Sequence, residues 1–201
     1  MILRFTIIFL LSASCFAETI HVLVALCDNV HQGIVPVPVK LGNGEDPRNN
    51  LYWGALYGIK THFKKSKDWQ LIETRKSPTN SILERCIFKH HSSQSYIVAD
   101  AYRGKAIKLC TQHFFAGALG RANQTIEANN KKLGLLAAAD LITYIGHNGL
   151  MDFQINVPTS TNKAIPSIVL ACKSQPYFGK DLTKPLILTK GSMAPEAYTV
   201  V

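Results

Sequence analysis

The sequence predicts an α/β protein, a three-layer α/β/α sandwich around a mostly parallel sheet. Nearly continuous apolar runs are typical of strands buried on both faces, and segments of helical periodicity separate them. Together the segments follow the order β-α-β-β-β-α-α-β-β-β. With 201 residues, 47% of them hydrophobic and 17% charged, the chain suits one well-packed domain.

Residues 1–17 have the features of a secretory signal peptide. Arg4 provides a basic start, an apolar run of about 10 residues follows, and Ala17 is a small residue at the exit. We expect cleavage after Ala17 and export to the periplasm or the medium, leaving a single domain over residues 18–201. The run is shorter than the roughly 20 apolar residues that span a bilayer, so we expect no stable membrane insertion of the mature protein.

The first half of the mature chain contains one buried strand, one helix and three further strands. Residues 19–26 are a nearly continuous apolar run and predict the first strand. After a loop rich in Gly and Pro, Asp46-Pro47 opens a predicted helix with an apolar stripe. Residues 69–74 and 82–89 predict a hairpin or edge strands, and residues 95–99 predict a strand. The stripe consists of Leu51, Ala55, Ile59 and Phe63.

The second half predicts two helices and three strands. One helix carries Ile107, Cys110, Phe114 and Ala118 on one face, and a second helix is expected at residues 125–139. Two strands precede His147 and Cys172, and residues 186–189 form the last one. Pro195-Glu196 then opens a helix with only a turn or two of chain left, so either that helix is short or the sequence is incomplete.

The charge balance is basic, with 22 Lys+Arg against 13 Asp+Glu and a net charge of +9. The basic residues are scattered, and no basic stripe alternates with stacking aromatic residues. We therefore interpret them as a solvated surface and expect no nucleic-acid partner. Neither a zinc-finger spacing nor a Cys-x-x-Cys motif occurs, and adjacent His90 and His91 would point to opposite faces of a strand, so we expect no metal.

Four cysteines remain after cleavage, namely Cys27, Cys86, Cys110 and Cys172. In an exported protein an even number favours disulfides, and three full pairings exist. Cys86 and Cys110 are the best candidates for a bridge because each lies within an element. Cys27 and Cys172 lie at strand ends, where a disulfide between them is an alternative to a reactive thiol.

Two predicted strands end in side chains that could act in catalysis. His147 follows a strand and precedes Asn148-Gly149, and Cys172 follows the next strand directly after Ala171. In an open α/β sheet, ligands and chemistry collect outside the carboxyl ends of the strands. A base and a nucleophile are thus expected at one edge.

These strand ends, in this order, resemble the clan CD cysteine peptidases, which include caspases, metacaspases, legumains and gingipains. The first strand, residues 51–56 and the strand that ends at Asp100 also follow the order of the caspase-like fold. The resemblance implies an exported cysteine hydrolase, a thiol protease acting on a peptide or protein without a cofactor. Cys172 would be the nucleophile and His147 the general acid/base of a dyad.

The resemblance also implies further site residues. Main-chain donors of Cys172 and Gly149 would form the oxyanion hole. The substrate pocket would draw on Asp28, Asn29 and the Gly191–Ser192–Met193 segment, with Asp100 and Asp152 nearby. Acidic residues there would favour a basic residue in the substrate.

Three features depart from the family pattern. Asn148 separates His147 from Gly149, the 25 residues from His147 to Cys172 are a short gap, and no acid directly precedes Ala171. A catalytically inactive caspase-like binding module, with Cys172 structural or disulfide-bonded, is therefore the second hypothesis. A thiol-redox protein is a third class, which the missing Cys-x-x-Cys disfavours.

Overall fold

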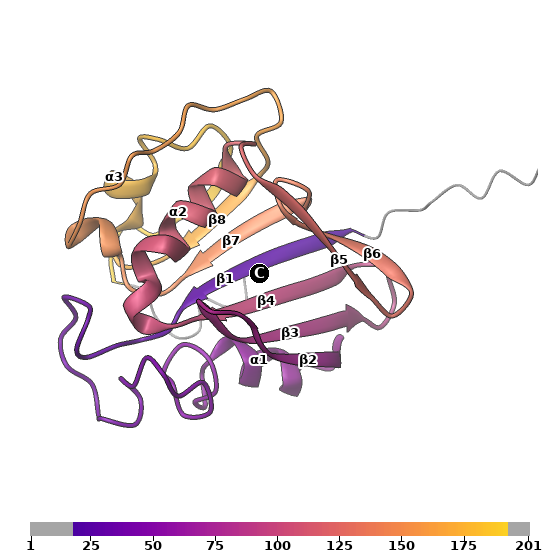
Figure 1. Ribbon diagram of the computed structural model, residues 1–201, viewed down its shortest axis with the longest axis horizontal. Helices are drawn as coiled ribbons and strands as arrows, with labels where there is room; N and C mark the ends of the chain where they lie inside the picture. Colours follow the sequence, from indigo (N-terminus) through magenta and orange to yellow (C-terminus); the bar gives the residue numbers. More distant parts are fainter. Residues whose placement is uncertain (1–17, 193–201) are drawn as a thin grey trace, which may run out of the picture.

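The computed structural model describes residues 18–192 as a mixed α/β fold with a seven-stranded sheet and a separate two-stranded hairpin (Figure 1). The predicted signal peptide, Met193 of the expected substrate pocket and the helix predicted from Pro195 lie outside the described residues. Among residues 18–192, no helix combines the length and the apolar character needed to cross a bilayer.

Residues 18–192 contain nine strands and three helices, with single 3₁₀ turns at Gly104–Ala106 and Gly149–Met151. The strands are β1 (Thr19–Ala25), β2 (Trp69–Thr79), β3 (Ile82–His90), β4 (Tyr96–Tyr102), β5 (Asn123–Ala128), β6 (Lys131–Leu136), β7 (Leu141–Ile145), β8 (Ser167–Leu170) and β9 (Pro185–Leu188). The helices are α1 (Ile59–Lys65), α2 (Ile107–Ala118) and α3 (Ser174–Phe178).

The large sheet has the strand order β2-β3-β4-β1-β7-β8-β9. Its five strands from β4 to β9 are parallel, and β2 and β3 add antiparallel pairs at one side. The predicted mostly parallel sheet is therefore confirmed. Because parallel strands share a direction, the residues that follow β1, β4, β7, β8 and β9 meet at one edge.

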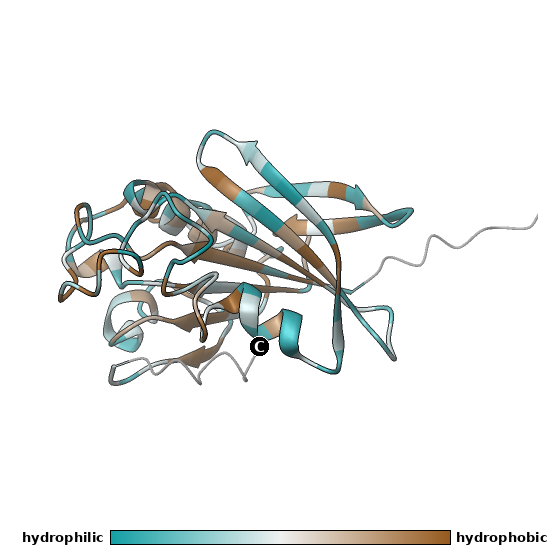
Figure 2. Cartoon of the chain, turned by 90° about the horizontal axis from the view of Figure 1, so that it is seen from below, coloured by the Kyte–Doolittle hydropathy of each residue, from teal (hydrophilic) through white to brown (hydrophobic). Residues whose placement is uncertain are grey.

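Apolar residues pack against both faces of this sheet. On one face, α2 and α3 contribute Phe114 and Phe178 to a cluster with Tyr144 of β7. On the other face, Ile59 and Phe63 of α1 join a second cluster. Figure 2 shows hydrophobic residues concentrated in the centre of the sheet, whereas the projecting hairpins alternate between hydrophobic and hydrophilic residues. Burial on both faces explains why the central strands are continuous apolar runs.

Two helix predictions are wrong. Residues 125–139 form no helix, because β5 and β6 pair as a hairpin around Asn129 and Asn130, whose φ angles are +50° and +56°. Two successive left-handed Asn residues suit a tight hairpin turn. The helix expected from Asp46-Pro47 begins only at Ile59, since the preceding residues form turns around the fully buried Asn50, whose side chain bonds the N–H and carbonyl of Cys27.

The expected disulfide between Cys86 and Cys110 is absent, and no disulfide joins any of the four cysteines in residues 18–192. Cys86 belongs to the cluster under α1, and Cys110 to the cluster under α2. The sheet therefore separates the two sulfur atoms, which a sequence pattern cannot reveal. The alternative bridge between Cys27 and Cys172 is absent as well.

Candidate functional site

The pairing of β7 with β8 places His147 and Cys172 at matching positions on neighbouring strands. Ile145 pairs with Leu170 in parallel register, and the Gly146 N–H continues the ladder by donating to the Leu170 carbonyl at 3.3 Å. His147 and Cys172 each follow two residues after this last pair. Since adjacent strands lie about 4.8 Å apart, the two backbones leave the sheet side by side.

Asn148 joins the two strand ends directly. This fully buried side chain donates from Nδ2 to the Cys172 carbonyl at 2.8 Å and to the Lys173 carbonyl at 3.4 Å. Its Oδ1 is buried and has no hydrogen-bond partner within residues 18–192. The residue that interrupts the His-Gly pattern thus holds the His147 segment against the Cys172 segment.

The imidazole of His147 is oriented by a carboxylate. Asp152 Oδ2 lies 2.8 Å from His147 Nε2 and also accepts the Gly33 N–H at 2.9 Å, which ties the loop after β1 to the pair. His147 is 9% exposed, and the Asp152 side chain 29%. In the tautomer that donates from Nε2 to Asp152, Nδ1 carries the lone pair of the ring and can accept a hydrogen bond. A thiol, an imidazole and a carboxylate that contacts the imidazole therefore lie at one edge of the sheet, the residue types that a cysteine nucleophile and its base require.

The segment after Cys172 is held in a tight turn. Lys173 has the left-handed conformation, with φ +50° and ψ +38°, and its N–H donates to the Gly191 carbonyl at 2.7 Å. The buried Ser174 hydroxyl donates to the Val169 carbonyl at 3.1 Å and accepts the Thr189 N–H at 2.8 Å. These contacts fix the backbone beside Cys172 between β8 and β9.

Lys173 gives a direct test of this turn. We expect Lys173→Gly to keep or raise the free energy of unfolding, by up to about 1 kcal/mol, because glycine adopts positive φ without a Cβ clash. Lys173→Val should lower it by about 1–2 kcal/mol, since a β-branched residue fits this conformation poorly. Urea denaturation measures both, with Lys180→Gly and Lys180→Val as matched controls. An equal effect of Gly and Val at position 173 would contradict the strained turn.

Cys172 differs from the other cysteines in its surroundings. It is half-buried, whereas Cys27, Cys86 and Cys110 are fully buried. Burial raises the pKa of Cys27 to about 11 and that of Cys86 to about 12, and it raises the pKa of Cys110 well above its usual range. These three thiols are therefore protonated and shielded from solvent at neutral pH. Of the four cysteines in residues 18–192, Cys172 is the one that a reagent or substrate can reach.

Gly149, the expected oxyanion donor, forms part of a closed turn. Its N–H donates to the His147 carbonyl at 3.0 Å, and that carbonyl also accepts the Tyr144 hydroxyl at 2.8 Å. A Cβ on Gly149 would lie 2.5 Å from the ring of Phe153, so a larger residue at this position would require that ring to move. An oxyanion hole that uses Gly149 needs this turn to open. The bond from Tyr144 would still satisfy the His147 carbonyl afterwards.

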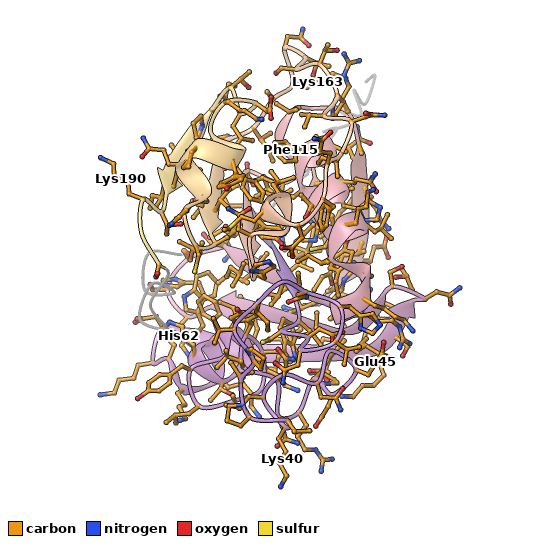
Figure 3. The ribbon with its side chains drawn as sticks, turned by 90° about the vertical axis from the view of Figure 1, so that its left-hand side faces the viewer. Lys40, Glu45, His62, Phe115, Lys163 and Lys190 are labelled. Carbon is orange, nitrogen blue, oxygen red and sulfur yellow. The ribbon has the colours of Figure 1, made fainter. Side chains whose placement is uncertain are left out.

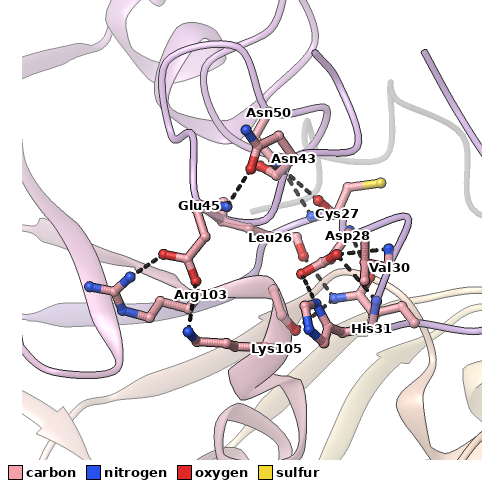
Figure 4. Close-up of polar contacts among 12 residues, drawn as sticks. Leu26, Cys27, Asp28, Val30, His31, Asn43, Glu45, Asn50, Arg103 and Lys105 are labelled. Carbon is pink, nitrogen blue, oxygen red and sulfur yellow. Dashed lines mark hydrogen bonds and ion pairs between the residues drawn. The ribbon is translucent and has the colours of Figure 1, made fainter. Parts of the chain in front are cut away.

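Asp28 and Asn29 lie at the predicted edge, but their side chains hold the loop after β1, as Figure 4 shows for Asp28. Asp28 is 4% exposed and accepts the Val30 N–H at 2.9 Å, while its other oxygen lies 2.9 Å from His31 Nδ1. Asn29 exchanges two hydrogen bonds with the backbone of Val37. Both residues therefore shape the edge rather than present an unpaired polar group to a substrate.

Of the remaining predicted pocket residues, Asp100 lies in the core and Ser192 lies near Cys172. Asp100 points into the core within β4, is 1% exposed, and is bonded by Arg85 at 2.6 and 2.7 Å and by His21 at 3.1 Å. The structure does not bring it to the Cys172 edge. Ser192 is exposed at the end of the described residues, and its neighbour Gly191 accepts the Lys173 N–H, which places this segment beside Cys172.

Sequence reasoning missed two roles at this edge. Asp152 was expected in the substrate pocket, yet its carboxylate contacts His147, and the spacing of five residues gives a turn that folds back on the imidazole. In the sequence Asn148 interrupts the His-Gly pattern, but in the structure its buried amide satisfies the carbonyl of Cys172. Among residues 18–192, no group of His, Cys, Asp and Glu side chains suits a metal ion.

Comparisons with family models, with curated proteins and with solved structures find no match for this chain.

Proposed function

We propose that the protein is an exported cysteine hydrolase of caspase-like fold that cleaves a peptide or protein through a His147/Cys172 dyad. The observation that carries the proposal is the parallel β7–β8 register, which brings the two residues to neighbouring positions, together with the carboxylate of Asp152 on His147. Helices on both faces of the sheet support a three-layer arrangement. The strand order β4-β1-β7-β8 keeps these ends at the centre of one edge.

The chemistry follows from the groups at the edge. His147 Nδ1 takes the proton of the Cys172 thiol, and the thiolate attacks the carbonyl carbon of the scissile amide. His147 then returns the proton to the leaving amine as the C–N bond breaks, which leaves a thioester on Cys172. Water, deprotonated by His147, attacks the thioester and releases the acid, and Cys172 regains its proton. Asp152 holds the imidazole and stabilises its protonated form.

A library of fluorogenic peptides tests the proposal. We expect the protein from residue 18 to hydrolyse a subset of the library and Cys172→Ala to abolish that hydrolysis, because Cys27, which also follows a strand at this edge, is fully buried and its pKa is raised to about 11. Cys110→Ala, which removes a buried thiol from the core under α2, is the matched control and should retain activity. Hydrolysis that survives Cys172→Ala would contradict the assignment.

A noncatalytic binding module of the same fold is the second candidate, and one observation favours it. The Gly149 N–H is bonded to the His147 carbonyl instead of pointing toward the position of an oxyanion. If this turn stays closed with substrate, the dyad lacks one donor, a loss of about 10²–10³ in kcat. A module of this kind would bind its peptide equally well before and after Cys172→Ala.

A further inference from the structure

A second polar cavity lies away from Cys172, on the α1 side of the sheet. It has a volume of about 470 Å³ and is bordered by the loop before α1, by α1 itself and by the β2–β3 hairpin. Four of its side chains are cationic and two are anionic. They are Arg48, Lys60, Lys64 and Lys76, and Asp46 and Glu84.

A buried carboxylate organises two of the cations. Glu84 is 1% exposed and accepts Lys60 Nζ at 2.5 Å, Lys76 Nζ, and the indole N–H of Trp53 at 2.8 Å. Burial alone would raise the pKa of Glu84, but these hydrogen bonds lower it to about 2, so the carboxylate stays ionised at neutral pH. Lys60 and Lys76 are therefore held in place before any ligand arrives, which reduces the entropy lost on binding.

The cationic side chains around the cavity have more hydrogen-bond donors than the two carboxylates of the cavity accept. Glu84 uses one of the three N–H groups of each lysine, and Asp46 accepts the Arg48 main-chain N–H at 2.9 Å and the Asn49 side chain at 2.7 Å. Arg48 and Lys64 are exposed residues that border the cavity, and neither forms a salt bridge within residues 18–192, although the charge of Arg48 lowers the pKa of Asp46. Four cations against two carboxylates leave an excess of two positive charges.

We propose that this cavity binds a doubly charged tetrahedral oxyanion, the phosphate or sulfate group of a ligand. A dianion matches the excess charge, and convergent ammonium and guanidinium donors are the groups that bind phosphate and sulfate oxygens. The site is independent of the proposed hydrolase, since it lies under α1 and β3 while Cys172 follows β8, four strands away in the sheet.

Isothermal titration with inorganic phosphate, and separately with inorganic sulfate, tests this site at constant ionic strength in chloride buffer. We expect saturable binding of at least one of the two anions. The double variant Arg48→Gln with Lys64→Gln should weaken anion binding at least about fivefold, because it removes two positive charges from the cavity. Both residues are exposed, so the variant leaves the contacts of Glu84 intact. Which anion binds identifies the group that the ligand carries.

The matched control is Lys163→Gln with Lys190→Gln, which removes the same charge from exposed positions. Figure 3 shows both lysines in the other half of the molecule from His62 of α1. This control should bind the anion within about twofold of the unmodified protein, since screened charges at that distance contribute little. No saturable binding of either anion, or equal weakening in the two double variants, would overturn the proposal.

Discussion

Replacing His147 with Ala is expected to lower kcat/KM for peptide hydrolysis by about 10³-fold, within the 10²–10⁴ that a general acid/base contributes. The His147 imidazole lies 2.8 Å from the Asp152 carboxylate, and it follows the strand that pairs directly with the strand before Cys172. In the proposed mechanism, its loss removes the base that takes the Cys172 proton and the acid that protonates the leaving amine. Steady-state kinetics on the best peptide of the library measures this loss.

The double variant sharpens this prediction. Cys172→Ala with His147→Ala should be no less active than Cys172→Ala alone, because the two residues act as one unit. His91→Ala, at an exposed position after β3, is the control histidine and should leave kcat/KM unchanged. A His147→Ala enzyme that retains activity within tenfold of the unmodified protein would remove His147 from the mechanism.

Asp100→Asn is expected to lower the free energy of unfolding by about 3–5 kcal/mol, the largest stability effect that we expect. The change leaves the buried guanidinium of Arg85 without the carboxylate that it contacts through two hydrogen bonds. His21 loses an acceptor as well, while its Nδ1 keeps the Leu136 N–H at 3.0 Å. Urea denaturation followed by circular dichroism measures the change.

An exposed ion pair gives the matched control for Asp100. Glu73→Ala removes a carboxylate that pairs with Arg75 at 2.6 Å near the surface, and it should cost at most about 1 kcal/mol. Asp100→Leu with Arg85→Met should be less destabilising than Asp100→Leu alone, since no buried charge is left unpaired. Similar costs for Asp100→Asn and Glu73→Ala would contradict the importance of the buried pair.

The same carboxylate predicts how stability depends on pH. Burial favours the neutral form, but hydrogen bonds from Arg85 and His21 outweigh it and lower the pKa of Asp100 below its usual range. Its stabilisation is thus complete above the unfolded value of about 3.9 and is lost as the pH falls through the depressed folded value. In the Asp100→Asn variant, the free energy of unfolding should therefore decrease less steeply as the pH falls below about 4.

The sequence predicted the strands that build the edge because their signal is local. Continuous apolar runs predicted β1, β4, β7 and β8, and the spacing of three or four residues between the apolar side chains from Ile107 to Ala118 predicted α2. The β5–β6 hairpin was missed because its residues lack β-branched enrichment, and only Asn129-Asn130 signalled the turn. The predicted disulfide between Cys86 and Cys110 is wrong because the two thiols lie on opposite faces of the sheet, and tertiary packing decides on which face each one lies.

The site was predictable in its residue types and not in its contacts. His147 and Cys172 follow strands whose adjacency depends on the order β1-β7-β8, which no local pattern specifies. Asp152 could be listed as an acid near the edge, but its contact with His147 depends on the turn over Gly149–Met151. Asp100 looked like a strand-end acid, yet β4 continues past it to Tyr102, so its side chain alternates into the core.

Pulse alkylation of the four cysteines is the most direct test of the central claim that His147 activates Cys172. The protein from residue 18 is treated with limiting iodoacetamide at pH 7, and mass spectrometry measures the labelling rate of each thiol. We predict that Cys172 is labelled well before Cys27, Cys86 and Cys110, and that His147→Ala slows Cys172 while His91→Ala does not. Labelling of Cys172 at the rate of the buried thiols, or a rate that His147→Ala leaves unchanged, would contradict the dyad.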